Sequence, residues 1–327
     1  MKVLVTGGTG FVGSQLVAAL VRRGDSVRVL HRANSSLLTL EGLPVEHVVG
    51  DILDPQTVER AVQGYDWVFH VAGLSSYWRA RREEIYRVNV EGTRLVMDAC
   101  LRAGVQRVVY TSSVAAIGIP PAGTVGREDT EFDPLSATFA YADSKRRAEE
   151  EVRRDVDRGL AAVIVNPAIV IGAGDQYLIA GQLGLDVARG RLPAVPPGGI
   201  CLVDVDAVVQ GHIAAAERGG VGERYILGGE NLSFREMATM IASMTGRPAP
   251  RRTLPRRALP VLGAIVDAAN RVSPRPQPVS GDQLRLSAWD LFFDSGKAVR
   301  ELGYPLLPFR GAAEKALRWY REHGYLA

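Results

Sequence analysis

The sequence predicts an α/β protein in which a doubly wound parallel sheet is joined to a smaller, partly interleaved C-terminal lobe. Three observations support this. Short apolar strands alternate with helices along the first half of the chain, and such alternation requires crossovers between parallel strands. The first strand leads directly into a glycine-rich turn that opens a helix. The regular alternation ends after Gly172, where prolines interrupt it.

The glycine-rich turn has the composition of a phosphate-binding loop. Residues 2–5 are predicted as a buried strand, residues 6–13 have the sequence TGGTGFVG, and residues 11–23 form a helix that ends at Gly24. The glycines allow the backbone to approach a pyrophosphate, which would lie at the positive end of the helix. A purely structural turn is the alternative, and the flanking strand and helix favour a binding site. A Rossmann fold that binds a dinucleotide is therefore expected.

The remaining elements continue this alternation. Further strands are predicted at 26–30, 45–49, 67–71, 107–110, 161–165 and 224–227. Helices are predicted at 55–64, 83–103, 141–158 and 233–245. The predicted domains are a Rossmann domain at 1–171, with a returning helix and strand near 204–229, and a substrate-binding lobe at 172–203 and 230–327.

Composition argues against several classes of protein. The 327 residues are 46% hydrophobic and carry a net charge of +3, which suits a large core and does not indicate nucleic-acid binding. The two cysteines and five histidines show no metal-ligand spacing. No stretch approaches the roughly 18 apolar residues of a membrane span, and the first strand begins at Lys2. We expect a cytoplasmic protein without metal, membrane span or nucleic-acid partner. The pairs Arg251-Arg252 and Arg256-Arg257 are expected to form a solvated connector.

Three side chains indicate acid–base chemistry. Tyr141 and Lys145 are four residues apart on a predicted helix, so they share one face. An ammonium beside a phenol favours the phenolate, and the pair would make tyrosine a usable acid or base. Ser113 follows the strand at 107–110 and faces the same crevice, where its hydroxyl could bind a substrate oxygen.

These residues belong to longer segments that resemble a known family. The segments are TGGTGFVG at 6–13, GDILD at 50–54, HVAG at 70–73, YRVNVEGT at 86–93, VVYTSSVAAIG at 108–118, YADSK at 141–145, NPAIVIGAGD at 166–175 and GERYILGGENL at 222–232. The chain resembles an extended short-chain dehydrogenase/reductase of the NAD-dependent epimerase/dehydratase family. Within that family it is most similar to bacterial dihydroflavonol-4-reductase-like proteins and hopanoid-associated sugar epimerases.

The resemblance implies roles for individual residues. Tyr141 would be the catalytic acid/base, Lys145 would hold the cofactor ribose and lower the tyrosine pKa, and Ser113 would orient the carbonyl. Asn89 matches an asparagine of the family, although a polar residue in helix packing explains it equally well. The resemblance also suggests a homodimer built on two long helices.

The residues at the end of the second strand indicate which nicotinamide cofactor is bound. NAD-selective sites place an acidic residue there, whereas this chain has His31-Arg32. A guanidinium can bind a 2′-phosphate, so NADP is favoured over NAD. Asp51 and Ile52 would flank the adenine. The full predicted cofactor set is Gly7, Gly10, Phe11, Val12, Gly13, Arg32, Asp51, Ile52, Val71, Ala72, Gly73, Thr111, Tyr141, Lys145, Pro167, Ile169 and Val170.

The predicted activity is hydride transfer between a nicotinamide and a carbonyl or alcohol of a small, weakly polar substrate. The alternatives are a sugar-nucleotide epimerase or dehydratase with bound cofactor, and a non-catalytic sensor of NADP. Similar epimerases carry two arginines for the diphosphate; one aligns with Ile200 here, and the other lies one place from Arg285. Tyr77 and Trp78 are candidate pocket residues, for which core or lid packing is as plausible.

Overall fold

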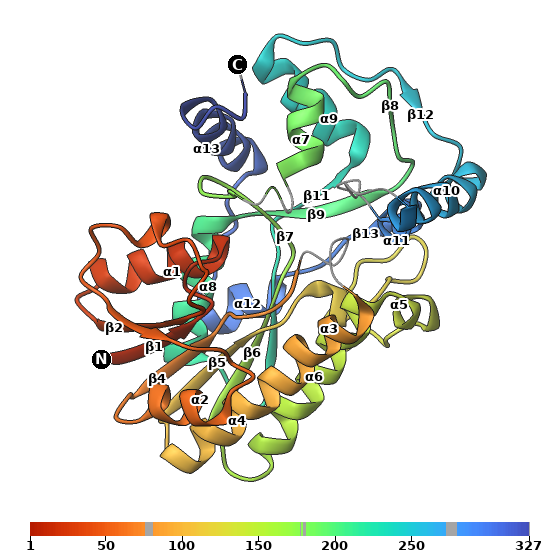
Figure 1. Cartoon of the computed structure of the whole chain (residues 1–327). Coiled ribbons are helices and arrows are strands. Elements are labelled where there is room, and N and C mark those ends of the chain that lie inside the picture. The colour runs from red at the N-terminus through yellow and green to blue at the C-terminus, as the bar shows by residue number, and fades with distance from the viewer. Residues whose placement is uncertain (76–80, 177, 179–180, 273–279, 327) are drawn as a thin grey trace.

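A seven-stranded sheet forms the larger lobe of the computed structural model, which describes residues 1–75, 81–176, 178, 181–272 and 280–326 (Figure 1). All neighbouring strands are parallel, in the order β3-β2-β1-β4-β5-β6-β10. The strands are β1 (Lys2–Thr6), β2 (Ser26–His31), β3 (Glu46–Val49), β4 (Trp67–His70), β5 (Arg107–Thr111), β6 (Ala162–Pro167) and β10 (Arg224–Leu227). The predicted doubly wound parallel sheet is confirmed. Tyr77 and Trp78 lie outside the described residues.

Helices cover both faces of this sheet (Figure 1). One face carries α2 (Pro55–Val62), α4 (Gly92–Ala103) and α6 (Ala140–Val156); the other carries α1 (Phe11–Arg22), α8 (Val205–Arg218) and α12 (Gly296–Leu302). Side chains of a strand alternate between these layers. In β1, Leu4 packs with the α2, α4 and α6 layer, whereas Val3 and Val5 pack with the α1 and α8 layer. This double burial explains why the strands are almost continuously apolar.

The chain order reverses at β1, because β2 and β3 lie on one side of it and β4 on the other. In open parallel sheets such a reversal leaves a crevice beyond the carboxyl ends of the strands, and ligands bind there. The glycine turn after β1 and the segment after β4 both lie at this edge. The fold therefore brings the predicted site residues to one edge of the sheet.

The helix predicted at 83–103 is interrupted. It consists of α3 (Arg82–Tyr86), a π-helical turn η2 (Arg87–Glu91) and α4. A π turn inserts one extra residue and is common at functional sites. Asn89 lies within this turn and is buried.

The smaller lobe contains a second sheet that the sequence did not predict. Its strands are β7 (Ile169–Ile171), β9 (Gly199–Asp204), β11 (Glu230–Ser233) and β13 (Asp290–Leu291), with β9 in the centre. Two further strands, β8 (Ala194–Val195) and β12 (Arg252–Thr253), pair with each other. The domain limits given above remain a prediction; β7, inside the first predicted segment, pairs with β9.

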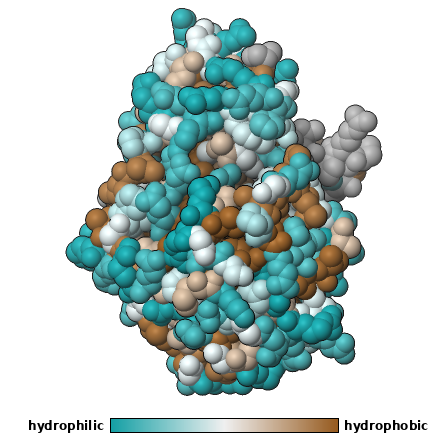
Figure 2. All heavy atoms as spheres, turned by 90° about the vertical axis from the view of Figure 1, so that its left-hand side faces the viewer, coloured by the Kyte–Doolittle hydropathy of each residue, from teal (hydrophilic) through white to brown (hydrophobic). Residues whose placement is uncertain are grey.

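The helices of this lobe lie above and to the right of the second sheet in the view of Figure 1. They are α7 (Gly181–Ala188), α9 (Phe234–Thr245), α10 (Leu259–Val272), α11 (Gly281–Leu286) and α13 (Phe309–Glu322). The remaining short elements are η1 (Leu38–Leu40), η3 (Val114–Ala116), α5 (Pro134–Thr138) and η4 (Arg256–Ala258). Figure 2 shows hydrophobic residues gathered at mid-height on one face, whereas its upper end is mostly hydrophilic.

Candidate active site

The turn between β1 and α1 has no room for side chains at two glycines. A Cβ on Gly13 would lie 2.1 Å from the Gly7 carbonyl oxygen. Gly7 has φ +72°, and its Cβ would lie 2.6 Å from the Ala72 backbone nitrogen. No side chain caps the start of α1, which begins at Phe11. The N–H groups at this positive helix end are therefore available to an anion, and the cradle fits a pyrophosphate.

The end of β2 presents a free cation. The His31 side chain is buried, and its ring nitrogens contact the Arg32 carbonyl oxygen at 3.1 Å and the His47 ring at 3.2 Å. The Arg32 guanidinium is exposed, and no described residue pairs with it. A buried histidine thus fixes the backbone that carries an unpaired arginine.

The segment after β3 supplies the two residues predicted near the adenine. The Asp51 carboxylate accepts a hydrogen bond from the Leu53 N–H at 3.0 Å. The Ile52 side chain is only 8% exposed and packs in the core beside Gly92. Asp51 therefore closes a local turn, and much of Ile52 is already covered by protein.

The end of β4 lies next to the predicted catalytic lysine. The Ala72 N–H donates to the Thr6 hydroxyl at 3.3 Å, which ties this segment to the end of β1. A Cβ on Gly73 would lie 3.1 Å from Lys145 Nζ and 3.3 Å from Asn89 Oδ1. The glycine therefore allows the backbone to pass close to both polar groups.

Ser113, Tyr141 and Lys145 converge beside the end of β5. Ser113 precedes η3, and its hydroxyl accepts from the Ala115 N–H at 3.2 Å. The same hydroxyl is hydrogen-bonded to the Tyr141 phenol. Lys145, on the same face of α6, donates from Nζ to the Thr111 carbonyl oxygen at 2.9 Å. The predicted trio is therefore assembled by β5 and α6.

The electrostatics of this trio differ from the sequence prediction. Burial raises the pKa of Tyr141, and the hydrogen bond to Ser113 opposes this rise. Burial lowers the pKa of Lys145 to about 8. The pKa of Tyr141 is thus raised, whereas the sequence predicted that Lys145 would lower it. The Lys145 ammonium donates to the Thr111 carbonyl oxygen and lies 3.5 Å from the Tyr110 hydroxyl. Tyr141 therefore keeps its proton at neutral pH.

Asn89 links the β4 segment to α6. Its Oδ1 accepts from the Leu74 N–H at 2.7 Å, and its Nδ2 donates to the Ser144 hydroxyl at 3.0 Å. Ser144 directly precedes Lys145. The π turn therefore places the Asn89 amide between these two segments, where it is hydrogen-bonded to both.

Buried side chains support the same region from behind. The His70 ring contacts the Thr6 hydroxyl at 2.8 Å and the Thr93 hydroxyl at 3.1 Å, and burial lowers its pKa to about 3. The Thr111 hydroxyl contacts His212 at 2.9 Å, and burial lowers the pKa of His212 to about 4. Thr111 thus binds α8 with its side chain and Lys145 with its carbonyl oxygen.

Glu149 is a buried residue that the sequence analysis missed. Its carboxylate accepts from the Ser112 hydroxyl at 2.6 Å and from Asn166 Nδ2 at 2.7 Å, and it pairs with Arg224 at 3.2 Å. It lies four residues after Lys145 on the sheet-facing side of α6, and its charge raises the lysine pKa against the effect of burial. The repeated spacing of four from Tyr141 was the available signal.

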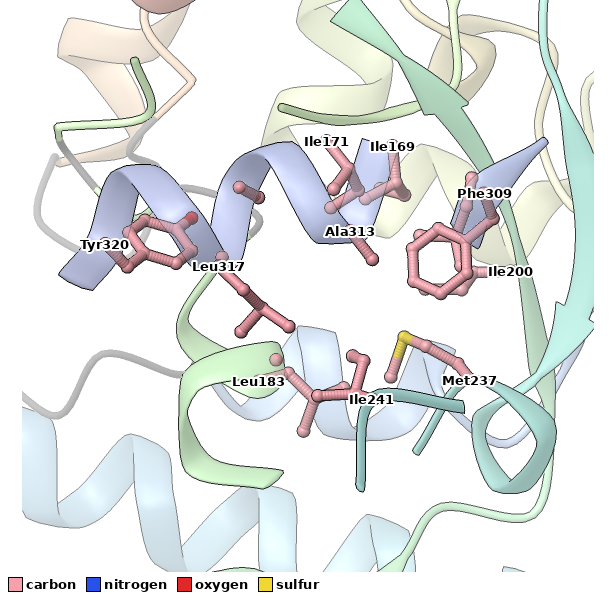
Figure 3. Close-up of a pocket in the computed structure, with 14 residues that line it drawn as sticks. Ile169, Ile171, Leu183, Ile200, Met237, Ile241, Phe309, Ala313, Leu317 and Tyr320 are labelled. Carbon is pink, nitrogen blue, oxygen red and sulfur yellow. The ribbon is translucent and has the colours of Figure 1, made fainter. Parts of the chain in front are cut away.

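The segment after β6 connects the crevice to an apolar cavity. Pro167 ends β6, and β7, which includes Val170, begins two residues later. Ile169 and Ile171 line a cavity of about 50 Å³ in the smaller lobe. Figure 3 shows their side chains near Ala313 of α13, with side chains of α7 and α9 opposite. The predicted cofactor residue Ile169 therefore also borders the smaller lobe.

The described residues form neither a metal site nor a membrane-spanning helix. Within residues 1–75, 81–176, 178, 181–272 and 280–326, no group of His, Cys, Asp and Glu side chains could hold a metal ion. No helix in this part of the chain is long and apolar enough to cross a membrane.

The glycine cradle, the crevice and the trio of Ser113, Tyr141 and Lys145 define an extended short-chain dehydrogenase/reductase. Residues 4–217 match the 3-beta hydroxysteroid dehydrogenase/isomerase family, and the chain belongs to this family. The family and its relatives are NAD(P)-dependent dehydrogenases, reductases and epimerases, so the protein is an enzyme of this kind. The predicted family resemblance is confirmed.

Individual relatives extend over the whole chain. A Synechocystis protein provisionally named a dihydroflavonol 4-reductase is 40% identical over 98% of this chain and 95% of its own. Sterol demethylase protein B of Methylococcus capsulatus is 36% identical over 100% of both chains. A solved nucleoside-diphosphate-sugar epimerase from Pseudomonas aeruginosa is 27% identical, with a TM-score of 0.81 and coverage of 100% of this chain and 99% of that one.

Proposed function

We propose that the protein is an NADP-dependent oxidoreductase that transfers hydride between the nicotinamide and a carbonyl or alcohol of a small, weakly polar substrate. The observation that carries this proposal is the trio, in which partly buried Tyr141 is hydrogen-bonded through its phenol to Ser113 and shares a helix face with the buried Lys145. A group that keeps its proton at neutral pH and lies at the cofactor crevice is suited to reduction.

Each residue of the trio would have a separate task. The Ser113 hydroxyl would bind the substrate oxygen and hold the phenol in place. Tyr141 would donate its proton to that oxygen during reduction and accept it during oxidation. Lys145 would bind the cofactor ribose and, when charged, favour the phenolate that remains after proton transfer. A reduced nicotinamide bound in the crevice would supply the hydride to the carbonyl carbon.

The preference for NADP rests on Arg32. Its guanidinium is exposed and without a partner among the described residues, at the place where NAD-selective sites carry an acid. A 2′-phosphate would give this cation two hydrogen-bond acceptors and a counter-charge. Gly7, Gly10 and Gly13, with the start of α1 at Phe11, would hold the pyrophosphate.

The substrate is proposed to lack a nucleotide diphosphate. Ile200 aligns with one of the two arginines that similar epimerases carry, and it lines the apolar cavity together with Ile169. Arg285 lies one place from the position of the second arginine. Its guanidinium pairs with Asp267 and Asp282, at 2.8 Å each. Two carboxylates already neutralise this guanidinium, which leaves little positive charge for a diphosphate.

Sugar epimerisation is the second candidate. It is favoured by the similarity to the Pseudomonas aeruginosa epimerase over the whole chain. An epimerase would oxidise and re-reduce the same substrate without net use of cofactor, whereas a reductase consumes NADPH at each turnover. We also propose that the enzyme acts in the cytoplasm as a homodimer and has no nucleic-acid partner.

The test measures the turnover of the wild-type protein and of Tyr141→Phe with a panel of ketones and aldehydes. Turnover is followed by nicotinamide absorbance. The variant should bind NADPH normally and lose roughly 100-fold or more in turnover, because it lacks the proton donor. Tyr65→Phe is the control, since it removes a phenol that binds Glu46 on the surface. Normal turnover by Tyr141→Phe would refute the mechanism.

A further inference from the structure

Helix α10 has an apolar stripe on its solvent side. Val261, Ile265 and Val272 are 62%, 58% and 83% exposed, and their spacing places them on one side of the helix. Ala264 and Ala268, on the same side, are also exposed. Single exposed apolar residues are ordinary on protein surfaces, whereas a stripe along three turns indicates a surface that something covers.

The opposite side of α10 accounts for its attachment to the protein. Gly263 lies so close to α11 that a Cβ there would be 2.9 Å from the Gly281 carbonyl oxygen. Asp267 accepts from the Gly281 N–H at 2.8 Å and pairs with Arg285. The acidic residue of the helix therefore faces inward and is neutralised, and the apolar stripe is left outside.

The segment that leads into α10 is strongly basic. Arg251, Arg252, Arg256 and Arg257 are exposed, and no carboxylate among the described residues pairs with any of them. Arg256 lies over the Trp289 ring, with its guanidinium carbon 5.2 Å from the ring centroid. Four arginines without a pairing carboxylate among the described residues therefore directly precede the helix that carries the apolar stripe.

We propose that α10 and residues 251–257, together called the α10 surface, bind peripherally to a bilayer that contains anionic phospholipids. Such a bilayer offers negative head groups to the arginines and an apolar region to Val261 and Ile265. A second copy of the chain is a poorer occupant, because a two-fold contact through the same surface would bring both sets of arginines together. Figure 1 shows α10 at the right-hand edge of the molecule.

The effect of each group on vesicle binding can be estimated. An arginine near an anionic membrane contributes about a 5-fold increase in partitioning, so loss of three should weaken binding roughly 100-fold. The charged part should also weaken with added salt. Replacing Val261 and Ile265 by serine should weaken binding independently of salt, because the apolar contact is lost.

The experiment is co-sedimentation of the full-length protein with vesicles of phosphatidylcholine, with or without phosphatidylglycerol. The test variants are Arg251→Gln/Arg252→Gln/Arg257→Gln and Val261→Ser/Ile265→Ser. The controls are Arg22→Gln/Arg318→Gln/Arg321→Gln, which removes equal charge elsewhere, and Leu306→Ser, which removes an apolar residue that is 60% exposed. Thermal unfolding verifies that each variant is folded.

The proposal predicts binding to the anionic vesicles only, weakened by both test variants and unchanged by both controls. Failure of the wild-type protein to bind anionic vesicles would overturn it. Equal weakening by test and control charge variants would also overturn it, because general attraction would then suffice. If Val261→Ser/Ile265→Ser instead converts a dimer to a monomer in sedimentation velocity without changing vesicle binding, the stripe is a protein interface and the proposal is wrong.

Discussion

Arg32→Ala should change the choice of cofactor without changing the fold. The guanidinium is exposed and forms no hydrogen bond or ion pair with the described residues, so its removal should alter the free energy of unfolding by no more than about 0.5 kcal/mol. A hydrogen bond to a charged group contributes about 1.5–3 kcal/mol. NADPH affinity should therefore fall roughly 10- to 150-fold, while NADH, which lacks the 2′-phosphate, should bind almost unchanged.

Fluorescence titration of NADPH and NADH against both proteins measures this difference. Arg22→Ala is the matched control, because it removes another exposed arginine, at the far end of α1 and about 17 Å along the helix axis from its start. The preference for NADPH should also shrink with added salt, since the contact is exposed. Equal affinities of the wild-type protein for the two cofactors would refute the assignment of Arg32.

Three further predictions concern the site and its support. Gly13→Ala should abolish measurable NADPH binding, because its Cβ would lie 2.1 Å from a backbone oxygen. The control is Gly311→Ala, whose Cβ would meet nothing within 4 Å and which should bind NADPH with the wild-type affinity. Asn89→Ala should lower the free energy of unfolding in urea by about 1–3 kcal/mol, because the Leu74 N–H loses its hydrogen-bond acceptor. The same variant should lower kcat more than it lowers NADPH affinity. An unchanged kcat would show that Asn89 serves only in packing. The free energy of unfolding should fall as the pH drops from 6.5 towards 4, by about 1.4 kcal/mol per pH unit for each buried histidine. In the unfolded chain His70 and His212 bind protons that they do not bind in the folded protein. A free energy of unfolding that does not change with pH in urea titrations would contradict this.

The larger lobe could be predicted from the sequence because its signals are local. Most strands of the seven-stranded sheet are short, mainly apolar runs, and Gly7 and Gly13 occupy positions that only glycine fits. The spacing of Tyr141 and Lys145 likewise gave the shared helix face. These features depend on residues close together in the chain.

The features that were missed depend on contacts between distant residues. The second sheet pairs Asp290 with Gly199, some 90 residues apart, and no local pattern announces that pairing. The pKa of Tyr141 is raised by burial under elements that are distant in the chain, so the spacing of Tyr141 and Lys145 could not predict it. The neutralisation of Arg285 by Asp267 is equally non-local.

The most direct test of the central claim separates reduction from epimerisation in one experiment. Wild-type protein is incubated with NADPH and weakly polar ketones, and separately with UDP- or GDP-hexoses without added reductant, while nicotinamide absorbance and sugar stereochemistry are followed. The proposed function predicts steady NADPH consumption with at least one ketone and unchanged hexoses. Inversion of a hexose with no net change in nicotinamide, and no ketone reduction, would contradict it.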